Sequence, residues 1–115
     1  MGATAEDIEQ VIVIEYIKQC TNLPVIHTAN QRQCSPQYGA LLKRMGVLKG
    51  VSDLFFPRGN SKYKGMFLEL KTLTGKPTKE QITFLDNMAK ENYFTQIAYG
   101  SKEAISIIKS FYELQ

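Results

Sequence analysis

The apolar residues of this chain recur at two different spacings, and the change of spacing divides the sequence into helices and strands. Apolar residues three or four places apart predict amphipathic helices, whereas alternation or a short apolar run predicts a strand. Helical spacing, together with capping residues, predicts four helices. These helices run from Thr4 to about Lys18, from Ser35 to Gly46, onward from Thr78 and onward from Ser101.

Strand patterns separate these helices. The predicted strands are residues 23–28, 51–56, 65–73 and 94–100. The loop between the second and third strands is short, which implies that they pair antiparallel. The resulting order, α-β-α-β-β-α-β-α, indicates an α/β (α+β) fold in which helices flank a central mixed sheet. A chain of 115 residues fits one domain, residues 1–115.

The same spacing predicts which helix residues face the core. The predicted apolar face of the first helix comprises Ile8, Val11, Ile12 and Tyr16, with Cys20 at its end. The other predicted faces are Leu41, Leu42 and Met45 in the second helix, Ile82, Leu85 and Met88 with Phe84 in the third, and Ala104, Ile105 and Ile108 with Phe111 or Tyr112 in the fourth.

Two acidic residues interrupt the apolar strands, where acids are uncommon. Asp53 lies within the run GVSDLFF, and Glu69 lies within GMFLELKT, two residues before Lys71. Because side chains alternate along a strand, Glu69 and Lys71 share one face and lie about 6.6 Å apart. If the two strands pair, Asp53 can lie beside Glu69. Two adjacent carboxylates repel each other unless a positive charge compensates them.

A divalent cation would provide that compensation. Carboxylate oxygens suit Mg²⁺ or Mn²⁺, and the backbone carbonyl of Leu70 would add a third ligand. In this hypothesis Lys71 orients or deprotonates a water molecule, or stabilises the charge that develops on a phosphate. The alternative is a partly exposed strand face with an ordinary Glu-Lys pair, because Glu-x-Lys alone is common in proteins of this length.

Cysteine and histidine are too scarce for several other kinds of site. The chain holds two cysteines without metal-ligand spacing, Cys20 and Cys34, and one histidine, His27. A zinc site needs more soft ligands, and one histidine gives little support to a Ser-His-Asp or Cys-His nucleophile. The apolar runs are too short to span a bilayer, and the acidic N-terminus lacks the basic flank of a signal peptide. We therefore expect a soluble, intracellular protein with no membrane partner.

Charge is distributed unevenly along the chain. Residues 1–15 carry four acids and no base, whereas residues 17–68 carry eight bases and one acid, a net charge of +7. Such a basic segment favours a polyanionic partner such as nucleic acid, although a solvated lysine-rich face would give the same pattern. The bases predicted to contact nucleic acid are Arg32, Lys43, Arg44, Lys49, Arg58, Lys62 and Lys64.

These motifs together resemble the PD-(D/E)XK nuclease superfamily and, more narrowly, the VRR-NUC domain, the virus-type replication-repair nuclease module. The similarity lies in KGVSDLFF, GMFLELKTLTGKPTKEQITFLDNM, AYGSKEAISII and the N-terminal AEDIEQVIVIEYI, so it covers nearly the whole chain. One departure is Ser52, which replaces the proline that often precedes the aspartate of the family. That position shapes the strand and does not hold metal.

The resemblance implies a restriction-endonuclease-like core and a role for each matching residue. The implied metal ligands are Asp53, Glu69 and the Leu70 carbonyl, and the implied catalytic residues are Asp53, Glu69, Lys71 and Gln81. Glu6 would complete the metal site, directly or through water, although Asp7 and Glu9 compete for that place. Gln81 also follows Thr78 by three residues, as in a capping box, and an acid such as Glu6 is favoured in a first helical turn without any catalytic role.

The activity that the resemblance implies is Mg²⁺- or Mn²⁺-dependent hydrolysis of DNA phosphodiester bonds by an endonuclease. Members of the family often act on branched, junction or flap DNA in replication, recombination or repair. A module of this size resembles phage-encoded versions, which would act in the cytoplasm of a bacterial host as homodimers. Two other functions stay open: a non-catalytic nucleic-acid-binding module with a vestigial metal site, and a structural or inhibitory protein that binds another protein.

Overall fold

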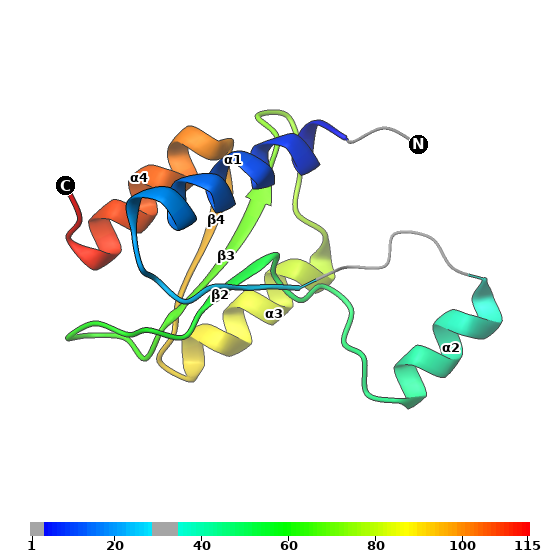
Figure 1. The fold of residues 1–115 in the computed structure, drawn as a ribbon. Helices are drawn as coiled ribbons and strands as arrows, with labels where there is room; N and C mark the ends of the chain where they lie inside the picture. Colours follow the sequence, from blue (N-terminus) through cyan, green and yellow to red (C-terminus); the bar gives the residue numbers. More distant parts are fainter. Residues whose placement is uncertain (1–3, 29–34) are drawn as a thin grey trace.

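The computed structural model describes residues 4–28 and 35–115, which form four helices around a four-stranded mixed sheet (Figure 1). The predicted order of elements is confirmed. The helices are α1 (Ala5–Cys20), α2 (Pro36–Arg44), α3 (Lys79–Lys90) and α4 (Ser101–Tyr112). The strands are β1 (Ile26–His27), β2 (Leu54–Phe56), β3 (Met66–Lys71) and β4 (Phe94–Tyr99). None of the described helices is both long enough and apolar enough to span a bilayer.

The strands lie side by side in the order β1-β2-β3-β4. β2 pairs antiparallel with both β1 and β3, as the short β2–β3 loop predicts, and β4 pairs parallel with β3. Helix α3 makes the crossover that a parallel pair requires. The strands are shorter than predicted. β2, for example, begins only at Leu54. Asp53 lies immediately before it, and the Asp53 carbonyl accepts a hydrogen bond from the Thr28 amide at 2.9 Å.

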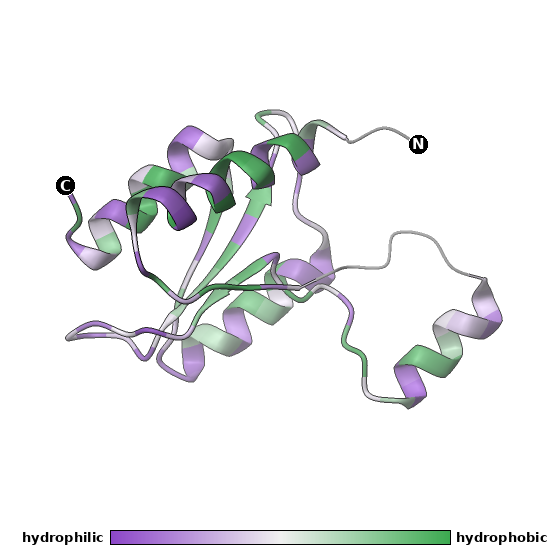
Figure 2. Cartoon of the chain, in the orientation of Figure 1, coloured by the Kyte–Doolittle hydropathy of each residue, from purple (hydrophilic) through white to green (hydrophobic). Residues whose placement is uncertain are grey.

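Helices cover the two faces of the sheet. α1 and α4 pack together over one face, whereas α3 packs mainly on β4 from the other (Figure 1). Apolar residues gather in the strands and in stripes along the helices (Figure 2). The core lies between the sheet and the α1–α4 pair and includes Leu54, Phe56, Met66, Leu68, Leu70, Ala98, Ala104, Ile108 and Phe111.

The core face predicted for α1 is confirmed only at Tyr16, which packs against the core, and is wrong for the other residues. Ile8, Val11 and Ile12 are 53%, 57% and 43% exposed, whereas Val13 and Ile17 are buried. The run VIVI places apolar side chains on several sides of the helix, so spacing alone does not select the buried side. Packing against α4 and β3 selects Val13 and Ile17, which lie four residues apart on one side of α1.

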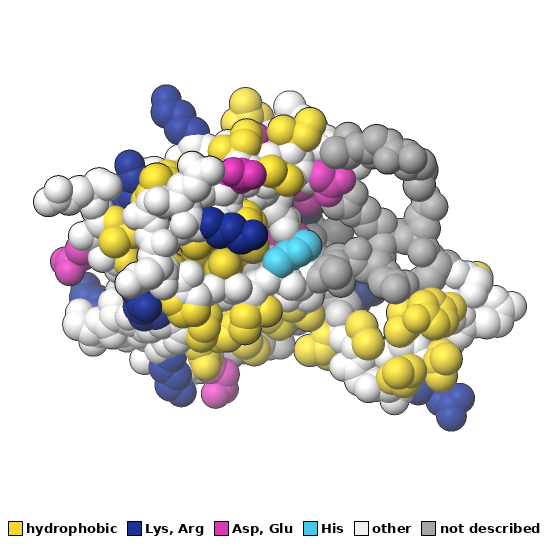
Figure 3. All heavy atoms as spheres, in the orientation of Figure 1, with side chains coloured by type: hydrophobic (Ala, Val, Ile, Leu, Met, Phe, Trp, Pro, Cys, Tyr) yellow, Lys and Arg dark blue, Asp and Glu magenta, His cyan; other side chains and the backbone are white. Residues whose placement is uncertain are grey.

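The apolar faces predicted for α2 and α3 are only partly used. No residue of α2 is fully buried, and Met45, which follows it, is 69% exposed. Figure 1 shows α2 projecting away from the sheet, and Figure 3 shows hydrophobic side chains gathered on its surface. In α3 Leu85 is buried, but Ile82 remains 44% exposed. In α4 the predicted stripe is confirmed by the burial of Ala104, Ile108 and Phe111.

Candidate metal centre

The β2–β3 hairpin brings the two strand acids together. Leu54 pairs with Leu68, so one further step of the same antiparallel register places Asp53 opposite Glu69. Both side chains are withdrawn from solvent, with 7% of Asp53 and 1% of Glu69 exposed. Buried carboxylates are rare unless they are paired or bind metal, so this pair is the strongest candidate for a functional site among the described residues.

A third carboxylate comes from the first turn of α1. One carboxylate oxygen each from Glu6, Asp53 and Glu69 lies within 4.8 Å of the others. We refer to these three residues as the acidic cluster. A capping box fixes the start of α1, because the Thr4 hydroxyl accepts from the Asp7 amide at 3.1 Å and the Asp7 carboxylate accepts from the Thr4 amide at 2.9 Å. The first turn of α1 thus places Glu6 at the open end of the β2–β3 hairpin, opposite its loop, beside Asp53 and Glu69.

The structure also distinguishes Glu6 from its two competitors. Asp7 is engaged in the capping box of its own helix. Glu9 crosses to α4, where its carboxylate accepts hydrogen bonds from the amide and hydroxyl of Ser101 at 3.1 and 3.2 Å. Gly100, the N-cap of α4, has no side chain with which to cap, so Glu9 caps α4 from another helix. The sequence predicts that Ser101 itself caps this helix, which is wrong, because Ser101 is the first residue of α4 and donates to Glu9 instead.

Hydrogen bonds from the backbone and from α3 orient the strand carboxylates. Asp53 Oδ2 accepts from the Leu70 amide at 2.8 Å, and Glu69 Oε2 accepts from Gln81 Nε2 at 2.9 Å. Lys71 Nζ lies 3.5 Å from the same Glu69 oxygen, with only about a tenth of the Lys71 side chain exposed. Glu69 Oε1 is buried and, among the described residues, has no hydrogen-bond partner. A buried carboxylate oxygen without a partner is costly, and a metal ion bound by Glu69 would offset that cost.

Burial raises the pKa of Glu69 to about 8, and repulsion from Asp53 adds to the rise while Lys71 opposes it. One lysine therefore does not compensate the acids. A proton on Glu69 would relieve the repulsion, and so would a divalent cation, which would also give Glu69 Oε1 a partner. Three carboxylate oxygens suit Mg²⁺ or Mn²⁺, so the residues present fit such an ion.

The Leu70 carbonyl faces the same edge of β3 as the acidic cluster. Within a strand the amide and carbonyl of one residue point to the same side, and successive residues alternate. The Lys71 carbonyl accepts from the Gly100 amide at 2.8 Å, so Lys71 faces β4. The Leu70 amide donates to Asp53, so Leu70 faces β2. Its carbonyl is therefore directed as the predicted third ligand requires.

Gln81 caps its own helix and also contacts the acidic cluster, whereas its catalytic role stays a prediction. Its side-chain oxygen accepts from the Thr78 amide at 2.8 Å and completes the capping box of α3, while its Nε2 donates to Glu69. Gly50 lets the two segments approach, because a Cβ at that position, where φ is +84°, would lie 2.5 Å from the Glu80 carbonyl carbon. The start of α3 is thus held against the segment that leads to Asp53.

The predicted basic residues fall into two groups. Lys43 and Arg44 lie in the last turn of α2, and Lys49 follows them in the segment that leads to β2. Arg58, Lys62 and Lys64 lie on the β2–β3 loop, at the end of the strands away from the acidic cluster. In the extended strand Lys64 and Glu69 are separated by roughly 16 Å. Arg32 lies outside the described residues.

The remaining candidates do not join the acidic cluster. Cys20 is exposed at the end of α1, and Cys34 lies outside the described residues. His27, the cyan side chain in Figure 3, is exposed on the edge strand β1. The sequence predicts that Phe55, Phe56 and Tyr63 are core or rim residues rather than platforms for stacked bases. Phe56 is fully buried, whereas Phe55 is half-buried and contacts Phe67 and Tyr93, which the sequence did not single out.

Comparisons with known proteins agree with this geometry. A family model described as the VRR-NUC domain matches residues 3–102. A solved structure described as "VRR_NUC domain protein" superposes with a TM-score of 0.84 at 26% sequence identity, over 99% of this chain and 93% of that one. No curated protein matches the chain.

Proposed function

The chain belongs to the VRR-NUC domain family, and we propose that residues 1–115 form a divalent-metal-dependent nuclease that hydrolyses DNA phosphodiester bonds. The family is of the nuclease type and implies a nucleic-acid substrate. The observation that carries the proposal is the buried acidic cluster, in which Glu69 Oε1 has no partner among the described residues. Burying Asp53 and Glu69 side by side, with the half-buried Glu6 close to both, is costly, and a bound divalent cation would offset that cost.

Each residue of the site has a defined task in this proposal. Glu6, Asp53, Glu69 and the Leu70 carbonyl would hold Mg²⁺ or Mn²⁺, which when bound would polarise the phosphate and neutralise its charge. The Leu70 amide holds Asp53, and Gln81 holds Glu69, so the ligands are oriented before an ion arrives. Preorganised ligands of this kind lose little entropy on binding.

Lys71 is the proposed catalytic cation. Its Nζ is held 3.5 Å from Glu69 Oε2, beside the place where a phosphate would meet the acidic cluster. In hydrolysis, a water oxygen bonds to phosphorus, the bond from phosphorus to the leaving oxygen breaks, and that oxygen gains a proton. Lys71 would orient the attacking water or stabilise negative charge as it accumulates on the phosphate oxygens.

The two basic groups would hold the DNA backbone on either side of the acidic cluster. Lysine and arginine side chains supply most non-specific affinity for phosphate, and that affinity weakens as salt rises. The set proposed for this task is Lys43, Arg44, Lys49, Arg58, Lys62 and Lys64, and Arg32 is proposed as a further contact from the sequence alone.

We extend the proposal to an endonuclease that prefers branched, junction or flap DNA and acts as a homodimer. The exposed apolar side chains of α1, Ile8, Val11 and Ile12, offer a surface on which a second copy could pack. Two copies would present two acidic clusters to one junction. Light scattering at working concentration would measure a mass of twice 13.0 kDa, and a strict monomer would remove this extension.

Cleavage of labelled DNA tests the proposed function. A four-way junction, a flap and a linear duplex of the same sequence are incubated with Mg²⁺, Mn²⁺ or EDTA. We expect cutting with metal and none with chelator, and faster cutting of the branched substrates. Equal cutting in EDTA, or no cutting of any substrate with either metal, would refute the proposal.

The same assay separates a nuclease from a binding module with a vestigial metal site. Asp53→Ala should abolish cutting and preserve or increase DNA affinity, because it removes a buried negative charge close to the phosphates. The binding module would be favoured if the wild-type protein binds DNA without ever cutting it and Asp53→Ala changes only the DNA affinity.

A further inference from the structure

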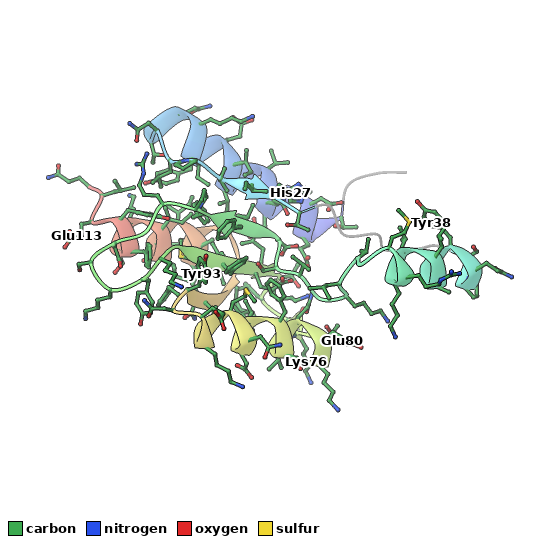
Figure 4. The ribbon with its side chains drawn as sticks, turned by 90° about the horizontal axis from the view of Figure 1, so that it is seen from below. His27, Tyr38, Lys76, Glu80, Tyr93 and Glu113 are labelled. Atoms are coloured by element: carbon green, nitrogen blue, oxygen red, sulfur yellow. The ribbon has the colours of Figure 1, made fainter. Side chains whose placement is uncertain are left out.

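Three aromatic rings form a continuous strip on the α3 face of the sheet. Phe55 and Phe67, which are paired across β2 and β3, stack with ring centroids 4.4 Å apart. Tyr93 meets both edge-on, at 5.9 Å from Phe55 and 5.2 Å from Phe67. We call Phe55, Phe67 and Tyr93 the aromatic strip. Figure 4 shows Tyr93 between the strands and α3.

The strip is not a second core. Each of its rings is half-buried, whereas Phe56, the next residue along β2 on the opposite face, is fully buried. α3 packs mainly on β4 and reaches the strip through Phe84, whose ring lies 5.3 Å from that of Phe67. On the β1 side the strip continues to Ile26, which pairs with Phe55 and is 53% exposed. Part of this apolar face therefore stays open to solvent.

The strip connects the acidic cluster to a basic loop. Phe55 follows Asp53 by two residues, and Phe67 precedes Glu69 by two residues in β3. Alternation along β3 therefore places the Phe67 ring on the same face as Glu69. At the other end Lys64 Nζ lies 5.9 Å from the centroid of the Tyr93 ring. A nucleic-acid strand laid along this face would meet a metal site, then stacked rings, and then cations.

We infer that the aromatic strip binds unpaired nucleotides that lead to or from the scissile phosphate. This inference rests on the proposed nuclease function. Aromatic rings stack on every base, which suits a strand whose bases are not paired, and a neighbouring lysine neutralises its phosphates. A fully paired duplex hides the faces of its bases and gains nothing from the strip. The strip would therefore give this protein its affinity for flaps, overhangs and the single-stranded parts of branched DNA.

The absence of tryptophan from the chain makes a direct test possible. Tyr93→Trp introduces one fluorophore into the strip. Phe94→Trp introduces one at the next residue, a half-buried ring on the α4 face that contacts Tyr63 and Phe111. Each variant is titrated with oligo(dT) in EDTA at low salt. We expect saturable quenching of Tyr93→Trp and little change in Phe94→Trp. No quenching of Tyr93→Trp, or equal quenching of both variants, would overturn the inference.

Affinity measurements supply the second test and distinguish this inference from the nuclease proposal. The probes, in EDTA, are a blunt duplex and the same duplex with a ten-nucleotide overhang on either end. Phe55→Leu and Tyr93→Leu should each weaken binding of an overhang about tenfold and leave the blunt duplex unchanged. Phe94→Leu serves as the matched control, and thermal unfolding checks that each variant is folded.

The two proposals can fail separately. If the wild-type protein cuts DNA with Mg²⁺ but the strip variants keep full affinity for overhangs, the strip inference fails and the nuclease stands. If the strip variants lose overhang affinity but the wild-type protein never cuts DNA, the nuclease proposal fails and the strip still binds unpaired nucleotides.

Discussion

The two faces of the β2–β3 hairpin are built from alternate residues of the same two strands, yet they serve different ends. On the α1–α4 face Leu54, Phe56, Met66, Leu68 and Leu70 have no exposed surface and form the core. On the α3 face the intervening residues are Phe55, Phe67, Glu69 and Lys71, and Asp53 immediately precedes β2. One face buries apolar side chains, and the other buries charged side chains next to half-buried aromatic rings.

This difference shows how a strand can separate stability from chemistry. The core face pins the register, because a slip of one residue would exchange the two faces and bury every acid in the core. With the register fixed, Asp53 and Glu69 meet without contributing to the core themselves. Holding the acids close together lowers the stability of the fold. Burial of the apolar face offsets that loss.

Exchanging one acid for its amide should give the largest effect of any single change. Glu69→Gln keeps the shape of the side chain and removes a proposed ligand charge. We expect cleavage to fall at least about 1000-fold, which corresponds to about 4 kcal/mol of activation free energy. Initial rates with Mg²⁺ measure this. Thermal stability should not fall, and a variant that cuts within tenfold of wild type would remove Glu69 from the mechanism.

Truncating the neighbouring core residue should lower stability and leave the metal site intact. Leu68→Ala removes a side chain with no exposed surface and should cost about 3 kcal/mol of unfolding free energy. Chemical denaturation measures the loss. The folded fraction should still bind Mn²⁺ with near wild-type affinity. A stable variant that loses metal binding would show that the two faces are not separable in this way.

The pH dependence of stability should differ between the faces. The pKa of Glu69 is raised to about 8 in the folded protein, so the proton is held more tightly there than in the unfolded chain. The stabilisation that this proton gives to the folded state is present below about pH 4.5. As pH rises to about 8 the free energy of unfolding should fall by roughly 2 kcal/mol, after allowance for solvent screening. Denaturation between pH 5 and 9 without metal measures the slope, with Glu69→Gln as control. The slope should flatten in that variant, and wild-type stability that rises over this range would contradict the assignment.

The smallest predicted effect separates the two tasks of Gln81. Thr78→Ala and Gln81→Ala each disrupt the capping box of α3 and should each cost about 1 kcal/mol of stability. Only Gln81→Ala also removes the donor to Glu69, so it alone should lower the cleavage rate, by about tenfold. Equal rates in both folded variants would reduce Gln81 to a helix cap.

Sequence patterns could predict the hairpin because its determinants are local. The connection between the strands suggests that they pair, and the two-residue alternation excludes registers that would bury the acids in the core, so the amino-acid sequence could place Asp53 beside Glu69 if the strands pair. The spacing of Thr78 and Gln81 likewise predicted the capping box of α3. The order of all eight elements followed from the same spacing rules.

The parts that could not be predicted depend on contacts between distant segments. The inner side of α1 is chosen by α4 and β3, and the run VIVI offered several sides. Glu6 was distinguished from Glu9 only because Glu9 reaches Ser101, 92 residues away. The detachment of α2 from the sheet likewise could not be inferred from Leu41 and Met45, whose spacing is that of an ordinary packed helix.

Calorimetric titration with Mn²⁺ tests the central claim most directly, because it needs neither a substrate nor a rate. The protein should take up Mn²⁺ saturably at pH 8, with release of the proton that Glu69 holds at lower pH. The double variant Asp53→Asn, Glu69→Gln, checked for folding, should take up none. An absence of binding by the wild-type protein, or equal binding by the double variant, would show that the acidic cluster is not a metal site.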